Sequence, residues 1–377
     1  MSLLGGTGGT GGTGGTGGTG GTGGTGGTGG TNLTGLGNFI GGGAPDPLTT
    51  EGLMISAQAI MHVVDEGEKT VTPKSLTMSA SSNLEGWAGW VRASLYLTEF
   101  LRHLGWSPPG RTSAGIELTW DGRSFLDIAR PEMSLFVQQT ELVRAYMDQR
   151  AERAPEILSQ LGFPIDYFAT ILGLNASRNR FTFELIAITQ VLTSHVAMVV
   201  KHHLACRRPD RLGITVMPMI PTPGHGAFPS AHAAEAFAVA TVLEGILDAD
   251  EVKNHYPSTP NLKRLLFKQA ERIAVNRTVA GMHFPIDSYA GAALGETVGR
   301  IVLRLCTDKA RVVKPVDYHA IHCDFTLAAF RPDLWPKLQD ENVPQAGLTR
   351  RDEPVSVAPS ELFEWLWTKA AAEFQLS

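Results

Sequence analysis

The stretch from Lys201 to Asp287 carries three short motifs: KHHLACRRP at 201–209, PSAH at 229–232 and RTVAGMHFPID at 277–287. Almost every residue of the chain that is suited to catalysis lies in them. Together they supply lysine, arginine, serine, histidine and aspartate side chains, which can surround a tetrahedral oxyanion and act on the atom at its centre. The stretch also lies among long helical patterns, so it decides both the expected fold and the expected chemistry.

Helical periodicity continues on both sides of the motifs. Apolar residues recur at three- and four-residue spacings, and almost nothing alternates with period two. One short hairpin is predicted at Ile116–Trp120, with Asp121-Gly122 as its turn. The predicted fold class is therefore all-α, as one helical bundle or two packed bundles. We predict helices over 87–104, 133–161 with an interruption at Pro155, 163–174, 178–204, 230–247, 261–282, 286–305 and 360–374.

Composition and pattern divide the chain into four parts. Residues 1–43 are rich in glycine and threonine, with an unbroken Gly-Gly-Thr repeat, and are expected to form a flexible tail. Residues 44–175 are predicted to be an N-terminal, mainly helical region. Residues 176–310 form the helical core that holds the motifs, and residues 311–377 form a C-terminal extension that ends in a helix.

Charge and cysteine content restrict the expected partners and environment. The 377 residues carry a net charge of −5, so no nucleic-acid partner is expected. The three cysteines have no metal-binding or redox spacing, and the N-terminus lacks the segments of a secretion signal, so we expect a cytoplasmic location. Charged residues interrupt the most apolar windows, at 181–205, 231–247 and 289–306, so no membrane span is expected. The oligomeric state stays open.

In the first motif, Lys201 and Arg208 stand at the end of a predicted helix. Lys201 lies inside the helix and Arg208 at its mouth, where Pro209 leads the chain away, so both side chains can reach one pocket. Taken alone, this motif fits a solvated basic helix end better, because the helix dipole favours cations there.

The second motif lies where a loop becomes a helix. Ser230 is expected near the N-cap, and the amides of the first turn, which begins at Ala231, form a ready site for a phosphate-like anion. A serine that only caps a helix is common. His232 in the first turn, beside the expected anion, favours the functional interpretation.

The third motif spaces Arg277, His283 and Asp287 by six and four residues. A helix is expected to end near His283 because Pro285 follows, and Asp287 begins the next one. Asp287 is then placed to accept the proton on one ring nitrogen of His283, so that the other nitrogen presents its lone pair to the pocket. A histidine oriented by a carboxylate is typical of an activated nucleophile or a ligand.

In this order and at these spacings, the motifs resemble the signature of the phosphatidic acid phosphatase type 2 and vanadium-dependent haloperoxidase superfamily. The motif region covers under a quarter of the chain, and the helical pattern around it is similar to the all-α bundle of that family. Two positions depart from the family pattern. Ala231 replaces the usual glycine, and Asn276 replaces the serine that commonly precedes the arginine.

The resemblance implies a role for each matched residue. Cations and hydrogen-bond donors would hold the oxygens of phosphate or vanadate: Lys201, Arg208, Arg277, Ser230 and the Ala231 amide. His283, held by Asp287, would be the nucleophile of a phosphatase or the axial ligand of vanadate in a haloperoxidase. His232 would be the general acid to the leaving group, or the acid–base partner of peroxide.

Two reactions fit this site, and we predict first a vanadate-dependent haloperoxidase-like enzyme that oxidises halide with hydrogen peroxide. The chain has a long helical N-terminal half and lacks the spans and the signal of the membrane and secreted phosphatases. His225 resembles a histidine near the active site of algal bromoperoxidases and is a candidate supporting residue. The alternative is a soluble acid phosphatase that hydrolyses phosphomonoesters through a phosphohistidine without a cofactor. The sequence His283-Phe284-Pro285 looks more like the phosphatases, and the spacing of Lys201 to Arg208 is one residue shorter than in the algal enzymes and matches the chloroperoxidase and phosphatase pattern. A non-catalytic helical scaffold is a further alternative, against which the intact set of motif residues argues.

Overall fold

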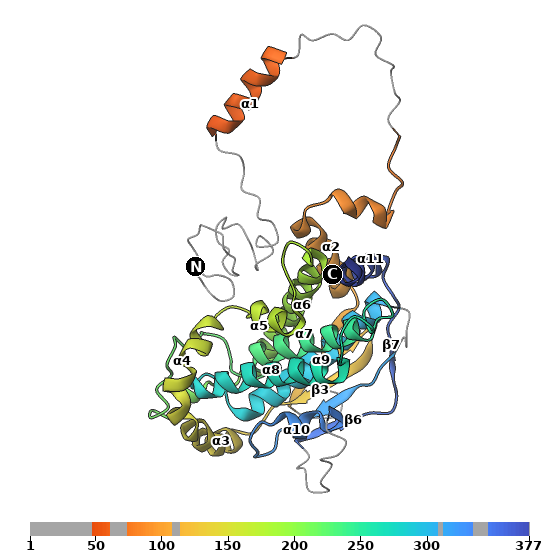
Figure 1. Ribbon diagram of the computed structural model, residues 1–377. Coiled ribbons are helices and arrows are strands. Elements are labelled where there is room, and N and C mark those ends of the chain that lie inside the picture. Colours follow the sequence, from red (N-terminus) through yellow and green to blue (C-terminus); the bar gives the residue numbers. More distant parts are fainter. Residues whose placement is uncertain (1–46, 61–73, 108–113, 308–311, 335–345, 377) are drawn as a thin grey trace. The chain divides into compact units, whose positions relative to one another are not determined.

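The computed structural model describes residues 47–60, 74–107, 114–307, 312–334 and 346–376 (Figure 1). The predicted flexible tail, 1–43, lies outside these ranges. The chain divides into two compact units, Met1–Arg92 and Ala93–Ser377. The first contains α1 (Pro47–Ile60), which the sequence pattern did not predict, and a 3-10 helix, η5 (Ser81–Gly86). The boundaries predicted at residues 43, 175 and 310 stay predictions.

The predicted helices are present, and most of their ends lie within three residues of the expected positions. Their bounds are α2 (Gly89–Leu101), α3 (Met133–Ala145), α4 (Arg150–Ser159), α5 (Ile165–Leu172), α6 (Arg180–Leu204), α7 (Ala231–Leu247), α8 (Thr259–Val279), α9 (Pro285–Cys306) and α11 (Glu361–Ala372), with a short unpredicted α10 (Leu327–Phe330).

The helix predicted over 133–161 is wrong in its point of interruption. It breaks between α3 and α4 at a 3-10 turn, η6 (Met147–Gln149), whereas Pro155 lies inside α4. At the break, the Arg150 guanidinium donates hydrogen bonds of 2.7–2.8 Å to the carbonyls of Val216, Met217 and Val279. These long-range bonds form only in the folded chain, so no local sequence pattern could predict them.

The all-α prediction is right about the helical majority but wrong about the absence of a substantial sheet. A five-stranded sheet has the order β1 (Leu104–Ser107), β2 (Gly115–Trp120), β3 (Arg123–Ala129), β5 (Val316–Tyr318) and β6 (Leu348–Arg350). A second sheet pairs β4 (Val312–Val313) with β7 (Val355–Ser356). The predicted hairpin is the β2–β3 pair, whose turn residues Asp121 and Gly122 both have positive φ. The other strands are two to four residues long, too short to show a period of two.

Helix α7 is the central element of the motif region. It packs against α6, α8 and α9, which lie around it in Figure 1. Nearly all of its residues are buried, as expected for a helix that is apolar on every side. Three glycines of α9, at 291, 295 and 299, allow a close approach: a Cβ on Gly295 would lie 2.0 Å from the backbone oxygen of Ala234.

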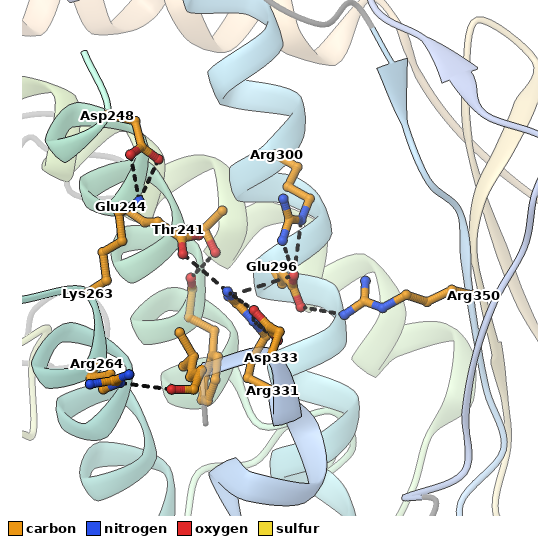
Figure 2. A network of polar contacts seen from close by, with 12 residues as sticks. Thr241, Glu244, Asp248, Lys263, Arg264, Glu296, Arg300, Arg331, Asp333 and Arg350 are labelled. Carbon is orange, nitrogen blue, oxygen red and sulfur yellow. Dashed lines mark hydrogen bonds and ion pairs between the residues drawn. The ribbon is translucent and has the colours of Figure 1, made fainter. Parts of the chain in front are cut away.

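A polar network ties α7 and α9 to the C-terminal segment (Figure 2). Glu296 of α9 is buried and accepts hydrogen bonds from Arg300 (3.0 Å from Nε) and Arg350 (3.2 Å). Arg331 donates to Glu244 of α7 at 3.1 Å and lies over the Phe267 ring of α8 at 4.3 Å. A cavity of about 540 Å³ lies beside this network, and the charges that line it are already paired with one another.

Helix α6 has a property that the sequence analysis did not expect. By length and composition alone, Arg180–Arg211 could cross a membrane, with a mean hydropathy of 1.6 over its most apolar window. That window is 61% buried inside the protein, which is typical of a core helix. The expected absence of a membrane span is therefore not confirmed, and a cytoplasmic location stays a prediction.

Candidate active site

The three motifs come together because each lies at a helix end beside α7. Lys201 lies in the last turn of α6, Ser230 is the N-cap of α7, Arg277 lies in the last turn of α8, and Asp287 lies in the first turn of α9. The backbone amide of Ser230 donates to the backbone oxygen of Asp287 at 2.9 Å, which fixes the starts of α7 and α9 against each other. The segments that carry the motif residues are therefore held by direct bonds and not only by general packing.

His283 is held by hydrogen bonds on both ring nitrogens. Nδ1 lies 3.0 Å from Asp287 Oδ2, which also accepts from the Phe284 amide at 3.0 Å. Nε2 lies 3.0 Å from a terminal nitrogen of Arg208. Because a guanidinium only donates, Nε2 is the acceptor and carries the lone pair, while Nδ1 carries the proton toward Asp287. The orientation expected from the sequence is thus present.

Lys201 and Arg208 both bind the loop that precedes α7. The Lys201 ammonium donates to the backbone oxygens of Gly226 (2.9 Å) and Ala227 (2.8 Å), and Arg208 donates to that of His225 (3.2 Å). A second Arg208 nitrogen lies 3.1 Å from His225 Nδ1. His225 is therefore linked to the site by its contacts with Arg208, while the residue itself is exposed. His202, His203 and Arg207, which lie in the first motif but are not candidate site residues, are exposed.

Ser230 has the N-cap geometry that the sequence predicted. Its φ and ψ are −71° and 117°, and its hydroxyl oxygen accepts from the Ala233 amide at 3.4 Å. Both Ser230 and Ala231 are buried. The first turn of α7 therefore begins inside the cluster of cations, where its dipole favours an anion.

Arg277 and His232 meet at a residue that no motif contains. The backbone oxygen of Gln160, just beyond α4, lies 2.9 Å from His232 Nε2 and 3.2 Å from an Arg277 terminal nitrogen. Its side-chain oxygen accepts from the other terminal nitrogen of Arg277 and from Asn276, at 3.1 Å each. Sequence reasoning missed Gln160 because it lies 117 residues before Arg277 and belongs to no recognisable spacing.

The motif residues include three buried cations, Lys201, Arg208 and Arg277, and the first two lie within electrostatic reach of Asp287. Burial lowers the pKa of Arg208 and of Arg277 to about 10, and burial together with Arg208 holds the pKa of Lys201 well below its usual value. The shifts mean that each charge is poorly solvated and would be stabilised by an anion. The cluster is built to receive a negatively charged group.

The two histidines are neutral in this environment. Burial lowers the pKa of His232 to about 3, with a further contribution from Arg277, and burial with Arg208 holds the pKa of His283 well below its usual range. Burial also raises the pKa of Asp287, against the Phe284 amide and the nearby cations. A neutral His283 can act as a nucleophile or as a ligand because its Nε2 lone pair is not protonated. An anion bound beside His232 would raise the pKa of that histidine toward its ordinary value.

Comparison with known proteins supports the resemblance seen in the motifs. The PAP2 superfamily model matches residues 182–311, which contain every motif residue. Two curated relatives, from two strains of Mycobacterium tuberculosis, are each named decaprenylphosphoryl-5-phosphoribose phosphatase. Each is 31% identical over 133 residues, which cover 35% of this chain and 66% of the relative, just under two thirds of its length. Residues 182–311, which hold the candidate site, are therefore similar to the PAP2 superfamily.

Proposed function

We propose that this protein is a phosphatase that hydrolyses phosphate monoesters through a phosphohistidine on His283. The observation that carries the proposal is the arrangement of His283: Nδ1 faces the buried Asp287, and Nε2 presents its lone pair to Arg208, one of the three cations. The relatives in the same superfamily, which are named as phosphatases, support this reaction over halide oxidation.

In the first half-reaction, His283 Nε2 attacks the phosphorus and the ester P–O bond breaks. Arg208 releases Nε2 and turns to a phosphate oxygen, with Lys201 and Arg277 on the other oxygens. The anionic substrate raises the pKa of His232, so that the ring takes up a second proton on Nδ1. The electron pair of the broken bond stays on the leaving oxygen, which takes that proton from the His232 imidazolium. The cations stabilise the charge that spreads over the equatorial oxygens in the transition state, which is where preorganised donors contribute most.

In the second half-reaction, water attacks the phosphohistidine and the P–N bond breaks. His232, now neutral, takes a proton from the water, which restores both histidines and releases inorganic phosphate. Asp287 accepts a hydrogen bond from the Nδ1–H of His283 throughout, and its carboxylate stabilises the positive charge that the ring carries while phosphorylated. The reaction needs no oxidant or reductant.

The proposed substrate is a small-molecule phosphate ester, and the surface beside Gln160 favours one with an apolar part. Leu158 and Leu161, which flank Gln160 at the end of α4, are 53% and 46% exposed. The name of the curated relatives specifies their substrate, decaprenylphosphoryl-5-phosphoribose, in which a phosphoribose is joined to a decaprenyl group. A sugar phosphate on an apolar carrier is therefore the first substrate to test, next to the free sugar phosphate.

A vanadate-dependent haloperoxidase remains the second candidate, because the same residues fit vanadate. Lys201, Arg208 and Arg277 would hold its oxygens, and His283 Nε2 is an unprotonated nitrogen ligand. The placement of His225 against Arg208 at 3.1 Å is the specific observation in its favour. Vanadate, when bound, would supply the activation of peroxide for halide oxidation.

The test assays the purified full chain in two ways: phosphate monoesters without vanadate, and bromide with peroxide and vanadate. We expect ester hydrolysis alone, phosphate on His283 after a rapid quench, and loss of turnover in His283→Ala with the helical circular dichroism unchanged. His202→Ala is the matched control, since that histidine is exposed on the same α6 end as Lys201. Vanadate-dependent halide oxidation without hydrolysis would favour the second candidate, and full turnover by His283→Ala would contradict the assigned nucleophile.

A further inference from the structure

Beyond the three motifs, we propose that Gln160 is a positioning residue. It fixes which ring nitrogen of His232 carries the proton, and it fixes the orientation of the Arg277 guanidinium plane. The inference rests on the proposed phosphatase function, because it concerns how these two groups meet the substrate. Gln160 is fully buried and binds both groups through two separate oxygens. No other residue outside the three motifs, in the part of the chain that the structure describes, is recorded with hydrogen bonds to both.

The backbone oxygen of Gln160 fixes the tautomer of His232. A carbonyl oxygen can only accept, so Nε2, 2.9 Å away, must carry a proton. The neutral ring then has its lone pair on Nδ1, and a second proton can bind only there. The imidazolium that protonates the leaving group is therefore stabilised by Gln160 on one nitrogen and acts as an acid through the other.

The same residue fixes the guanidinium of Arg277. One terminal nitrogen donates to the backbone oxygen of Gln160 at 3.2 Å, and the other donates to its side-chain oxygen at 3.1 Å. Two bonds to one residue restrict rotation of the guanidinium plane. Nε of Arg277 is buried and has no hydrogen-bond partner among the described residues, so it is the donor that an incoming phosphate oxygen can satisfy.

The side-chain oxygen of Gln160 is held by Asn276 of α8, and its backbone amide donates to the Glu156 carbonyl of α4 at 3.0 Å. Asn276 donates to the Gln160 side chain at 3.1 Å and to Glu156 at 3.0 Å, and Arg153 donates to Asn276 at 3.0 Å. Glu156 in turn accepts two hydrogen bonds from Arg272, at 2.9 and 2.6 Å. Asn276, which departs from the serine of the family pattern, thus anchors Gln160. A group held this firmly can orient catalytic residues before the substrate binds.

Two variants distinguish a positioning role of Gln160 from a general effect on the stability of the fold. Gln160→Met keeps the approximate volume and the backbone oxygen but removes the side-chain oxygen that accepts from Arg277, and we expect KM for a phosphate monoester to rise about tenfold, as for the loss of one charged hydrogen bond. Gln160→Glu keeps the acceptor but places a carboxylate on Arg277, where it competes with the substrate. We expect that variant to raise both KM and the Kd of inorganic phosphate, measured by calorimetry, by at least tenfold. It should also move the pH–activity profile upward, because a carboxylate there stabilises the His232 imidazolium.

The matched control is Glu373→Gln, which weakens a buried anchor at the other end of α6. Glu373 accepts hydrogen bonds from the amides of Phe181 and Thr182, at 2.8 and 2.9 Å. We expect it to lower the melting temperature without changing KM or the pH profile. Unchanged KM, phosphate Kd and pH profile in both folded Gln160 variants would overturn the inference. A wild-type protein that binds phosphate but hydrolyses no ester would contradict the proposed function instead, and the phosphate Kd of the variants would still test Gln160.

Discussion

At the scale of single residues, the protonation of His232 should affect stability in mild acid. Its pKa is about 3 in the folded protein, lowered by burial and by Arg277, against an ordinary value of 6.5. As the pH falls from 6.5, the unfolded chain takes up a proton that the folded site refuses, so stability is lost progressively down to about pH 3. Between pH 6.5 and 4.5 the loss amounts to about 2–3 kcal/mol.

The variant His232→Gln removes this titration while it keeps a donor for the Gln160 oxygen. We expect the melting temperature of the wild type to fall more than that of the variant between pH 6.5 and 4.5. Asp287 acts in the opposite sense, because a raised pKa gives stability that is lost as the pH increases. That contribution is present in both proteins, so the difference between the two melting curves isolates His232. Parallel curves would show that His232 is not buried in the neutral form.

How much of the site could be predicted depends on whether its residues share a local pattern. Ser230 and Asp287 were predictable because helix starts favour these residue types, and the contact of Asp287 with His283 follows from a spacing of four across a proline-marked helix start. Gln160 follows no such rule. It contributes a backbone oxygen, which every residue has, and its place is set by the packing of α4 against α8.

At the scale of elements, long helices were predicted well and short strands were not. A helix such as α9 repeats its apolar pattern over 22 residues, which is enough to define both its type and its buried face. Strands β5 and β6 have three residues each, and their partners lie far away in the sequence, so only the folded sheet defines them. The β2–β3 hairpin was the exception because Asp121-Gly122 provides a local turn signal.

The contact between α7 and α9 gives a prediction at this scale. An alanine at Gly295 would place a Cβ 2.0 Å from the backbone oxygen of Ala234, and backbone atoms inside a helix cannot move aside separately. The clash should exceed the gain of up to about 1 kcal/mol in helix propensity, leaving a net loss of about 1–3 kcal/mol. We expect Gly295→Ala to lower the melting temperature by several degrees. Phosphatase activity should fall too, because α7 and α9 carry Ser230 and Asp287.

The control for this prediction is Gly52→Ala. Gly52 also lies inside a helix, α1, but a Cβ there would meet nothing within 4 Å. Without a clash, only the gain in helix propensity remains, so the melting temperature should not decrease. Equal melting temperatures for Gly295→Ala and the wild type would mean that α7 and α9 can separate without cost.

At the scale of the whole molecule, the C-terminal segment has a structural role that its sequence did not reveal. Arg331 and Arg350 are far in sequence from the motifs, and neither lies in a pattern that predicts burial. In the fold they converge with Arg300 on Glu296 of α9 (Figure 2). The extension predicted at 311–377 thus contributes strands and ion pairs to the same compact unit as the motifs.

Glu296 provides the test of this role. The charges of Arg300, Arg350 and Arg331 lower its pKa to about 2 in spite of burial, so the stability it confers is present above the ordinary value of 4.5 and is lost as the pH falls toward 2.

Glu296→Gln leaves these arginines without their shared carboxylate, and breaking a buried pair in this way costs about 3–5 kcal/mol. We expect a melting temperature lower by roughly 6 °C or more at pH 7, about half that difference from the wild type near pH 3, and a still smaller one as the pH approaches 2. Asp250→Asn, which breaks the exposed pair with Lys253, should leave the melting temperature unchanged. The KM of Glu296→Gln, measured below its melting transition, should equal that of the wild type, because Glu296 has no recorded contact with the cations that we propose bind phosphate. A raised KM at that temperature would mean that the network also shapes the active site.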